Sequence, residues 1–515
     1  MRRAHIVFAA GAAALALAAP LPAGAAKLPE HPDKLKFPEL AYTPPAAKDY
    51  RVELENGMVA YLVPDRSLPL VSIEVLMRIG PDLDPAGRAG LAQGMVHLLT
   101  RSGTASKSAQ EIEDRVAYLG ASLSSRMGGG GGGFFGPGGA PLGDTESAAS
   151  INLLSKDLDE GLAILIDCLK QPAFEAERVE LARQQALQDI KQRNDDSRTI
   201  EAYQWDYLMF PDDHWVNRKT TEPSVKSITR DELAAFHERY VGPANFMITV
   251  AGDFDRDAVV AKLEQAFADW GHTAENPGPP AAPASAPAPG WHLTEKDVNQ
   301  GRVTMGLTAP DRYDPDYQAY RVMNVILGGG GFSSRLVNRI RSDEGLAYSV
   351  NSTFEGGTYY DAIWRIRFQS KVRSVPGAVD IALEEMKRMA AQPVTAEELN
   401  LARNLLVQSL PVAFETAQSI AGVLAMEELT GRYARDPNYW QELRDRVNAV
   451  TSADVERVAK KLLDPAKLVV LAVGDTEEML KGDPKYDASL EALAGGAPKY
   501  LPLRDPMTMQ PIANP

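Results

Sequence analysis

Hydrophobic and polar residues alternate in the first part of the chain, as they do in half-buried β-strands. Two alternating runs within residues 51–63 flank Asn56-Gly57, a dipeptide typical of tight hairpin turns. The same period of two recurs further along, and each recurrence predicts another strand. These further strands are predicted at residues 71–77, 121–125 and 147–154.

A helical period of three to four residues fills the segments between these strands. In residues 108–119, Ala109, Ile112 and Val116 share one face, and the acidic residues lie on the other. Because strands and helices do not alternate as regular βαβ units, the pattern favours an α+β fold. Other helices are predicted at residues 90–99, 157–170 and 175–193.

One segment of the chain repeats far downstream. Residues 227–253 align without gaps to residues 449–475, at an offset of 222. A period this long indicates a duplicated domain, since solenoid repeats are much shorter. We therefore expect two homologous α+β lobes, each a mixed or antiparallel sheet covered by helices. The predicted parts are a signal peptide (1–25), an arm (26–48), an N-terminal lobe (49–271), a Pro/Ala-rich linker (272–290), a C-terminal lobe (291–476) and a tail (477–515).

The N-terminus has the layout of an export signal. Arg2 and Arg3 precede an apolar run over residues 6–21, and Ala23-Gly24-Ala25 forms a small-residue cleavage pattern. We expect cleavage and a periplasmic location; the alternative is an uncleaved anchor helix. No other apolar run approaches the roughly 20 residues that a membrane span needs, so no span is expected after the signal is removed.

Composition narrows the possible partners. The 515 residues are 44% hydrophobic and 24% charged, as in soluble globular proteins, and the net charge of −15 argues against nucleic acid as a partner. Cys168 is the single cysteine, so an internal disulfide is excluded. It lies in an apolar run and is interpreted as a core residue. The Gly-rich residues 128–139 lack the Lys-Ser/Thr of a phosphate loop, and we expect a flexible loop there.

The helix predicted at residues 90–99 carries the first motif. The pattern around Gly90-Leu91-Ala92 and Gly103-Thr104 resembles the pitrilysin/insulinase metallopeptidases, which bind zinc through an inverted His-x-x-Glu-His motif. In that register the five positions read Gln93, Gly94, Met95, Val96 and His97. Only the last histidine remains, with Gln93 in place of the first ligand and Val96 in place of the general base. The alternative is that His97 is an ordinary packing residue.

The second motif lies in the C-terminal half. A Gly-rich segment followed by Ser-Ser-Arg-Leu (327–336), then Arg341 and Tyr348 around Gly-Leu-Ala, resembles the non-catalytic lobe of the same family. The resemblance implies that this arginine and tyrosine hold the substrate carbonyl and stabilise the oxyanion, as a fixed cation and phenol can do. The alternative is a surface charge at Arg341 and a core strand residue at Tyr348.

The resemblance places the third metal ligand, normally a glutamate, at Asp189. His97 and Asp189 would supply two ligands where a catalytic zinc site needs three. His237 has no second histidine at ligand spacing, and the sequence contains no complete zinc motif. No metal cofactor is therefore expected in this chain, and zinc is expected in a partner. The remaining histidines considered, His31, His214, His272 and His292, are predicted to lie in loop-like segments.

Two lobes with the Arg–Tyr pair but without the zinc residues predict a particular role. The chain is expected to be the non-zinc subunit of a periplasmic heterodimeric zinc peptidase acting on unfolded peptides. Its partner would be a zinc-bearing insulinase-family subunit, and the peptide would add as a strand to a sheet edge. The alternatives are a non-catalytic peptide-binding or assembly scaffold, and an independent zinc peptidase with an unusual ligand set.

Overall fold

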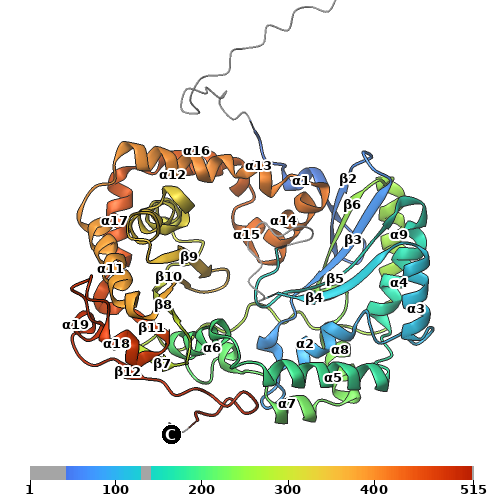
Figure 1. Cartoon of the computed structure of the whole chain (residues 1–515). Coiled ribbons are helices and arrows are strands. Elements are labelled where there is room, and N and C mark those ends of the chain that lie inside the picture. The colour runs from blue at the N-terminus through green and yellow to red at the C-terminus, as the bar shows by residue number, and fades with distance from the viewer. Residues whose placement is uncertain (1–41, 129–140, 513–515) are drawn as a thin grey trace, which may run out of the picture. The chain divides into compact units, whose positions relative to one another are not determined.

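Two six-stranded sheets form the framework of this protein (Figure 1). The structure is a computed structural model that describes residues 42–128 and 141–512. The predicted signal peptide, most of the arm and most of the Gly-rich loop lie outside the described residues. Tyr42–Pro515 forms one compact unit.

The N-terminal sheet has the order β1-β2-β6-β3-β5-β4. Neighbouring strands are antiparallel except β2 and β6, which are parallel, so the sheet is mixed. The strands occur where the alternating pattern predicted them, including the hairpin at Asn56-Gly57. Their bounds are β1 (Arg51–Glu53), β2 (Val59–Pro64), β3 (Leu70–Met77), β4 (Ser122–Met127), β5 (Ser147–Leu154) and β6 (Phe246–Gly252).

The C-terminal sheet repeats this arrangement in the order β12-β7-β11-β8-β10-β9. Here β7 is parallel to β11, as β2 is to β6, but it is also parallel to the edge strand β12, whereas β1 and β2 are antiparallel. The repeated segments supply β6 and β11, which hold the same position in the two sheets, and the predicted α+β fold is confirmed. The bounds are β7 (Gly290–Glu295), β8 (Gln300–Ala309), β9 (Ala347–Gly356), β10 (Ala362–Lys371), β11 (Val469–Gly474) and β12 (Lys499–Tyr500).

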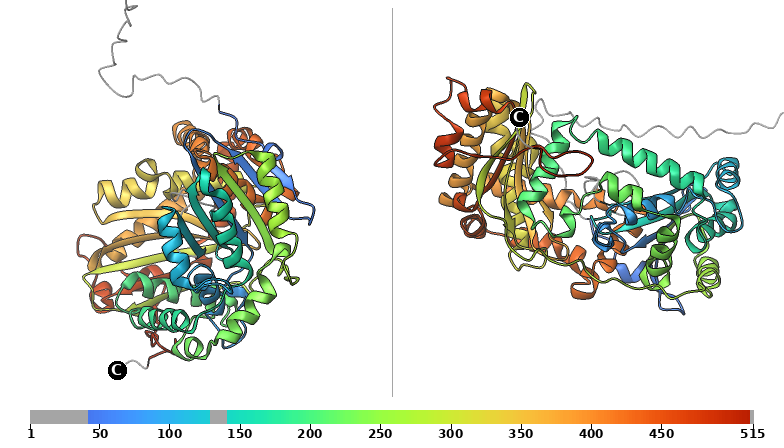
Figure 2. Two further views of the ribbon diagram at one scale, coloured as in Figure 1. Left: turned by 90° about the vertical axis from the view of Figure 1, so that its right-hand side faces the viewer. Right: turned by 90° about the horizontal axis from the view of Figure 1, so that it is seen from below.

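Helices cover the N-terminal sheet and build its core. Ser108 accepts a hydrogen bond from the Glu111 amide and the Glu111 carboxylate caps Ser108, which fixes the start of α3. Figure 2 (left) shows α4 and α9 over one face of the sheet, where Leu165 and Leu263 join the hydrophobic core. The helices are α1 (Ala47–Tyr50), α2 (Leu91–Leu98), α3 (Ala109–Tyr118), α4 (Leu158–Lys170), α5 (Ala176–Lys191), α7 (Glu222–Ser227), α8 (Arg230–Tyr240) and α9 (Arg256–Phe267).

The C-terminal lobe has a corresponding set of helices. Thr451 and Asp454 form a capping box at the start of α17, 222 residues after the same device at Thr229 and Glu232. No helix or strand is assigned between Phe267 and Gly290, where the linker was predicted. The helices are α10 (Tyr317–Asn324), the π-helices η6 (Val325–Gly329) and η8 (Val337–Asp343), α11 (Val375–Ala391), α12 (Ala396–Gln408), α13 (Leu410–Ala413), α15 (Arg432–Arg435), α16 (Tyr439–Ala449), α17 (Ser452–Leu462), α18 (Thr476–Lys481) and α19 (Leu490–Ala494).

Two further helices are exchanged between the halves (Figure 1). α6 (Ser197–Met209) belongs to the N-terminal half but packs on β11 and β8, and α14 (Ala417–Leu429) belongs to the C-terminal half but packs on β6 and β2. Residues 421–426 of α14 are all buried, so every side of this helix is covered. Each sheet therefore depends on a helix from the other half of the chain.

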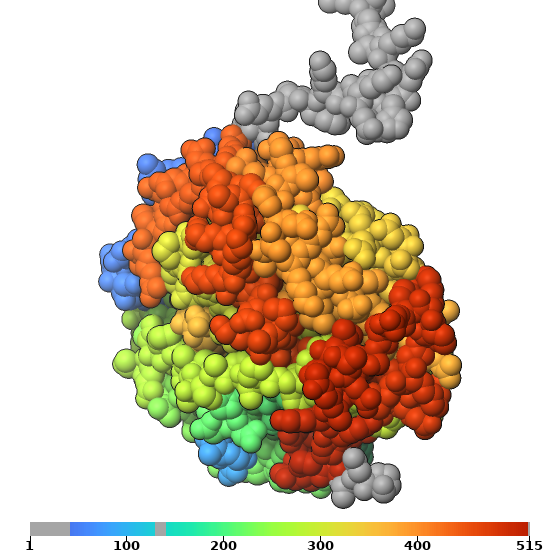
Figure 3. All heavy atoms as spheres, turned by 90° about the vertical axis from the view of Figure 1, so that its left-hand side faces the viewer, coloured from blue at the N-terminus to red at the C-terminus, as the bar shows by residue number. Residues whose placement is uncertain are grey.

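The C-terminal segment also joins the two halves. β12 pairs with β7, and Leu501 and Leu503 then pack beside α6. Gln204 donates its Nε2 to the carbonyl of Pro502 at 2.7 Å, and the Glu222 amide donates to the carbonyl of Met507 at 2.7 Å. In Figure 3 this dark red segment lies against green residues of the N-terminal half. None of the helices in residues 42–128 and 141–512 is long and apolar enough to cross a membrane.

Candidate functional site

Three of the four predicted zinc-motif positions lie in one cavity. The cavity measures about 550 Å³ and lies between α2 and α5, with residues of α7 and α8 completing its wall. Gln93 and His97 reach it from α2, and Asp189 reaches it from α5. Gln93 and Asp189 are exposed and His97 is half-buried. The structure thus brings together residues that are almost one hundred positions apart in sequence.

Val96 is the one predicted zinc-motif position that does not line this cavity. Its side chain is fully buried and belongs to the hydrophobic core of the N-terminal lobe, and it does not line the cavity. Ala92, Met95 and Leu99 are buried in the same core. The position that the family resemblance assigns to the general base is therefore a packing position in this chain.

The start of α2 is held by a buried carboxylate. Asp84 accepts hydrogen bonds from the amides of Gly90 and Ala92, both at 2.7 Å. Burial raises the pKa of Asp84 to about 7. Farther along α2, burial and the charge of Arg101 lower the pKa of His97, which favours the neutral imidazole at pH 7. His97 is therefore in the protonation state that a metal ligand requires.

The donor set around His97 does not fit a catalytic zinc ion. A catalytic site uses three protein ligands from histidine, cysteine or carboxylate side chains. The cavity offers His97 and Asp189, while the amide of Gln93 is a weak zinc donor. Within the described part of the chain, no group of three or more His, Cys, Asp or Glu residues is placed to hold a metal ion.

His237, His292 and Cys168 are buried and have structural roles. His237 is buried, and its Nε2 lies 2.7 Å from the carbonyl oxygen of Leu169. His292 was predicted in a loop-like segment; this was wrong, because it lies in β7 and is buried. His31 lies outside the described residues. Burial raises the pKa of the Cys168 thiol to about 12, consistent with the predicted core position.

The sequence did not point to several side chains that line the same cavity. The Arg193 guanidinium lies 5.1 Å from the centre of the Tyr203 ring and donates to the carbonyl oxygens of Thr220 and, at 3.2 Å, Pro506. Arg193, Tyr203 and Thr220 all line the cavity. They come from the turn after α5, from α6 and from the loop before α7, and no local sequence signal connects these segments.

Arg341 and Tyr348 form a pair in the C-terminal lobe. Arg341 lies in η8, with its guanidinium 4.5 Å from the centre of the Phe332 ring and 5.0 Å from that of Tyr348. Tyr348 is 86% exposed on β9, so the alternative that it is a core residue was wrong. Arg341 lines a second cavity of about 670 Å³, which shares no lining residue with the cavity around His97.

A free strand edge lies beside α2. β4 packs against α2 and pairs with β5 on one side. On its other side, no strand in residues 42–128 or 141–512 pairs with it. Ser125 of β4 lies next to α2, with its hydroxyl 3.5 Å from the carbonyl oxygen of His97. Such an edge can accept an extended peptide through main-chain hydrogen bonds.

Comparison with known proteins points to the M16 peptidases. The profile described as "Peptidase M16 inactive domain" matches residues 227–406, which include Arg341 and Tyr348. An uncharacterized zinc protease of Mycobacterium tuberculosis is 27% identical over 405 residues, which are 76% of this chain and 85% of that protein. The chain therefore carries an M16 inactive domain and is similar to M16 proteins over most of its length. The zinc motif of M16 peptidases is incomplete in residues 93–97.

Solved structures share the M16 fold. The peptidase M16 inactive domain from Pseudomonas fluorescens superimposes with a TM-score of 0.70 at 22% identity, covering 82% of this chain and 97% of that one. The periplasmic protease PqqL from Escherichia coli gives a TM-score of 0.67 at 17% identity, covering 84% of this chain and 46% of that one. At these identities the likeness concerns the fold, and it agrees with the predicted two-lobe architecture.

Proposed function

We propose that this chain is the non-zinc subunit of a heterodimeric M16 peptidase that cleaves unfolded peptides. One observation carries the proposal. The cavity beside α2 offers two zinc-donor side chains where three are needed, while Arg341 and Tyr348 stand together in the other lobe. A zinc-bearing M16 subunit would supply the metal and the general base. Arg341 and Tyr348 would supply the cation and phenol that stabilise negative charge on the substrate carbonyl oxygen.

The exposure of this pair supports a role between subunits. Tyr348 and Phe332 are 86% and 70% exposed, so both rings that flank Arg341 are open to a partner. The free edge of β4 beside α2 would hold the peptide as an added strand. The predicted export signal in residues 1–25 supports a periplasmic location, as does the structural likeness to a protease described as periplasmic.

The test mixes the purified chain with a zinc-bearing M16 chain encoded beside it and measures cleavage of an unfolded peptide. Adding this chain should raise the activity of the partner. Arg341→Ala should lower the activity of the mixture by about a hundred-fold, the usual cost of losing one oxyanion donor. Arg435→Gln is the matched control, because Arg435 also stacks on a tyrosine, Tyr313, at 4.1 Å. Unchanged activity on adding the chain, or with Arg341→Ala, would rule out the shared site.

A scaffold that binds peptides without contributing to cleavage is the competing function. The incomplete donor set of the cavity agrees with it equally well. The same mixture separates the two, because a scaffold would retain peptides in a pulldown but leave the partner's cleavage rate unaltered.

A further inference from the structure

One buried arginine in the cavity beside α2 has no counter-charge. We call this space the N-terminal cavity. Arg193 lines it, lies in the turn after α5 and is only 8% exposed. Its Nη1 donates to the carbonyl oxygens of Thr220 and Pro506, and its guanidinium carbon lies 5.1 Å from the centre of the Tyr203 ring. In the described part of the chain, its Nε and Nη2 find no acceptor, and no carboxylate pairs with it.

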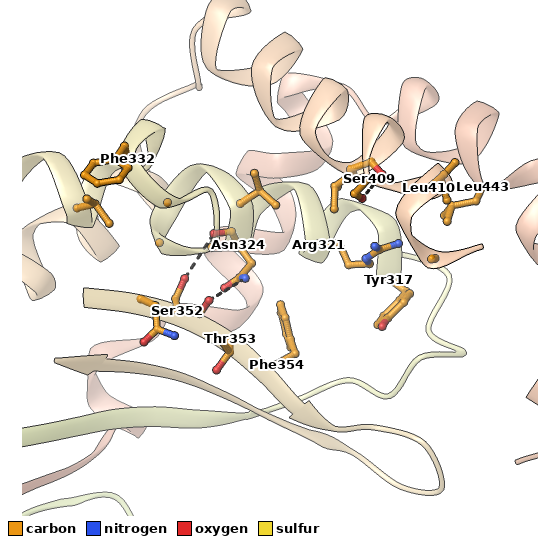
Figure 4. A pocket seen from close by; sticks show the side chains of 18 of the residues that line it. Tyr317, Arg321, Asn324, Phe332, Ser352, Thr353, Phe354, Ser409, Leu410 and Leu443 are labelled. Carbon is orange, nitrogen blue, oxygen red and sulfur yellow. Dashed lines mark hydrogen bonds between the residues drawn. The ribbon is translucent and has the colours of Figure 1, made fainter. Parts of the chain in front are cut away.

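The other buried arginines of residues 42–128 and 141–512 are paired. Each has a guanidinium nitrogen 2.6 to 2.9 Å from a carboxylate oxygen of the chain. One of them, Arg432, lines the C-terminal cavity that Figure 4 shows from close by. The pairs are Arg78–Asp82, Arg335–Glu398 and Arg432–Glu427. Arg193 therefore differs from the other arginines that are equally shielded from water.

An unpaired buried cation favours an arriving anion. Taking a charge out of water is costly unless a partner of opposite charge compensates, and the described residues supply Arg193 with none. Nε and Nη2 lie on one edge of the guanidinium plane, which matches the two oxygens of a carboxylate. Asp189 also lines the cavity and is exposed, and its charge would repel a second negative charge on the ligand. A singly charged carboxylate is therefore the head group that fits.

Small residues open a channel next to this position. Gly94 on α2 and Ala182 and Ala186 on α5 all line the cavity, so the two helices leave a gap that larger side chains would fill. Val179 and Ile190 line it too, and they lie eleven residues apart on α5, or about 16 Å along the helix axis. Further apolar residues of the lining are Leu98, Val225, Ile228 and Leu233. The cavity thus has a long apolar wall with a cation at one end.

The source of these walls indicates the body of the ligand. They come from helices, whose main-chain groups are already bonded within the helix. The walls therefore offer no row of free main-chain donors and acceptors, and the amides of a peptide would lose their hydrogen bonds to water without replacement. A hydrocarbon chain loses no such bonds and is stabilised by burial.

We propose that the N-terminal cavity binds a medium-chain fatty acid. Its carboxylate accepts hydrogen bonds from Nε and Nη2 of Arg193, and its chain lies along Ala186 and Ala182 toward Val179. Binding requires neither a metal ion nor a partner chain. This goes beyond the proposed function, because it gives the incomplete metal site a ligand of different chemistry.

Calorimetry with the purified chain tests the proposal. Octanoate and octanamide have the same hydrocarbon chain and differ in charge. Octanoate should bind about ten-fold more tightly, because a charge-assisted hydrogen bond contributes roughly one power of ten. Equal affinities would overturn the proposal. Inorganic phosphate should bind more weakly than octanoate, and phosphate binding of equal strength would overturn it as well, because the site would then recognise charge alone.

Variants locate the carboxylate. Arg193→Gln should remove the advantage of octanoate, and Arg193→Lys should keep part of it, because lysine retains the charge without the fork. Arg178→Gln is the matched control, since Arg178 lies on α5 outside the cavity and pairs with Glu113 at 2.9 Å; both affinities should stay unchanged. An advantage that survives Arg193→Gln would overturn the assignment. If Arg193→Gln does not fold, octanoate against octanamide on the unaltered chain decides.

A last pair of measurements locates the hydrocarbon chain. Ala186→Leu fills the channel and should weaken octanoate binding about ten-fold; an unchanged affinity would overturn the placement. Acetyl-Leu-Leu carries the same single carboxylate on a peptide and should bind more weakly than octanoate, and tighter binding would overturn the choice of a fatty acid. None of these measurements involves cleavage, zinc or a partner chain, so their failure is separate from failure of the proposed function.

Discussion

The two lobes share a sheet order but differ in the chemistry of their cavities. In the N-terminal lobe, the cavity beside α2 combines a histidine, a carboxylate and an amide with Arg183 and Arg193. In the C-terminal lobe, the cavity beside Arg341 is lined by arginines and apolar side chains, and its lining contains no aspartate or glutamate. The sheets are conserved within the molecule because the core fixes them, whereas the cavity side chains are free to diverge. A duplicated scaffold has thus produced two unlike sites in one chain.

The exchanged helices show a second difference. Glu201 on α6 is 1% exposed and bonds with Thr304 and, at 2.9 Å, Arg367 of the C-terminal sheet. Glu428 on α14 is 15% exposed and accepts hydrogen bonds from Tyr61 at 2.6 Å and Arg51 at 2.8 Å. Each lobe is therefore joined to the other half through a carboxylate, but the one on α6 is better shielded from water.

The largest effect is expected from removing the better shielded carboxylate. Glu201→Ala leaves Arg367 without its partner beside a buried surface, and should lower the free energy of unfolding by about 4 kcal/mol. Glu428→Ala should lower it by about 2 kcal/mol, because water can partly replace the lost contact. Urea unfolding followed by circular dichroism measures both. Equal losses would mean that the two helices are anchored alike.

The pH dependence of stability should also differ between the lobes. Burial lowers the pKa of His237 in the N-terminal lobe to about 4, from an ordinary 6.5, and burial also lowers the pKa of His292 in the C-terminal lobe. The unfolded state then binds the proton more readily, so stability is lost as the pH falls from about 6.5 to about 4. At His237 this amounts to about 3 kcal/mol.

His237→Gln should remove most of that loss, and His292→Gln should remove less. Unfolding free energies measured at several pH values across the window give the slopes. The matching position to His237 in the second repeat is Ala459, which is also buried. A slope that His237→Gln leaves intact would place the acid sensitivity elsewhere.

A single substitution should create a metal site in the N-terminal cavity. Gln93→His would place two histidines four residues apart on α2, facing the cavity that also contains Asp189. We expect zinc affinity at least a hundred-fold above that of the unaltered chain, measured by calorimetry with zinc alone. Gln318→His, outside the cavity on α10, is a control and should bind no tighter. No gain with Gln93→His would show that the three side chains cannot converge.

The smallest expected change in stability concerns Gly252 and Gly474, which hold matching positions in the two repeats. Gly252 ends β6 with φ +121°, and an added Cβ there would collide with the carbonyl oxygen of Leu70. Gly474 ends β11 with φ +157°, and its added Cβ would meet the flexible side chain of Met479. Gly252→Ala should cost about 2 kcal/mol and Gly474→Ala about 1 kcal/mol. Thermal unfolding of both variants checks the order, which would be reversed if the Met479 side chain could not move.

Much of the fold was predictable because its signals are local. The Asn56-Gly57 turn, the amphipathic helix after Ser108 and the paired segments at 227–253 and 449–475 each act within a short stretch of sequence. The exchange of α6 and α14 was not predicted. Periodicity shows that a helix has an apolar face, but it does not show which of two sheets that face covers.

The site was predictable only in part, because only some of its signals are local. Alignment with the family's zinc motif pointed to Gln93, His97 and Asp189, and the structure brings these residues to one cavity. Val96 could have been assigned to the core from its spacing with Ala92 and Leu99 on the same helix. Arg193 and Tyr203 could not have been found, because their contact with each other forms only when α5, α6 and the C-terminal segment pack together. The roles of Arg341 and Tyr348 stay predictions.

The helix exchange constrains how this chain can acquire its structure during synthesis. β2 and β6 are finished by residue 252, but the helix that covers them begins at residue 417. A growing chain therefore carries a sheet with the apolar surface under α14 still uncovered while more than a hundred further residues are made. Until then the first lobe can rely only on its own helices, and this interval is when the nascent protein is most exposed to aggregation and to chaperones.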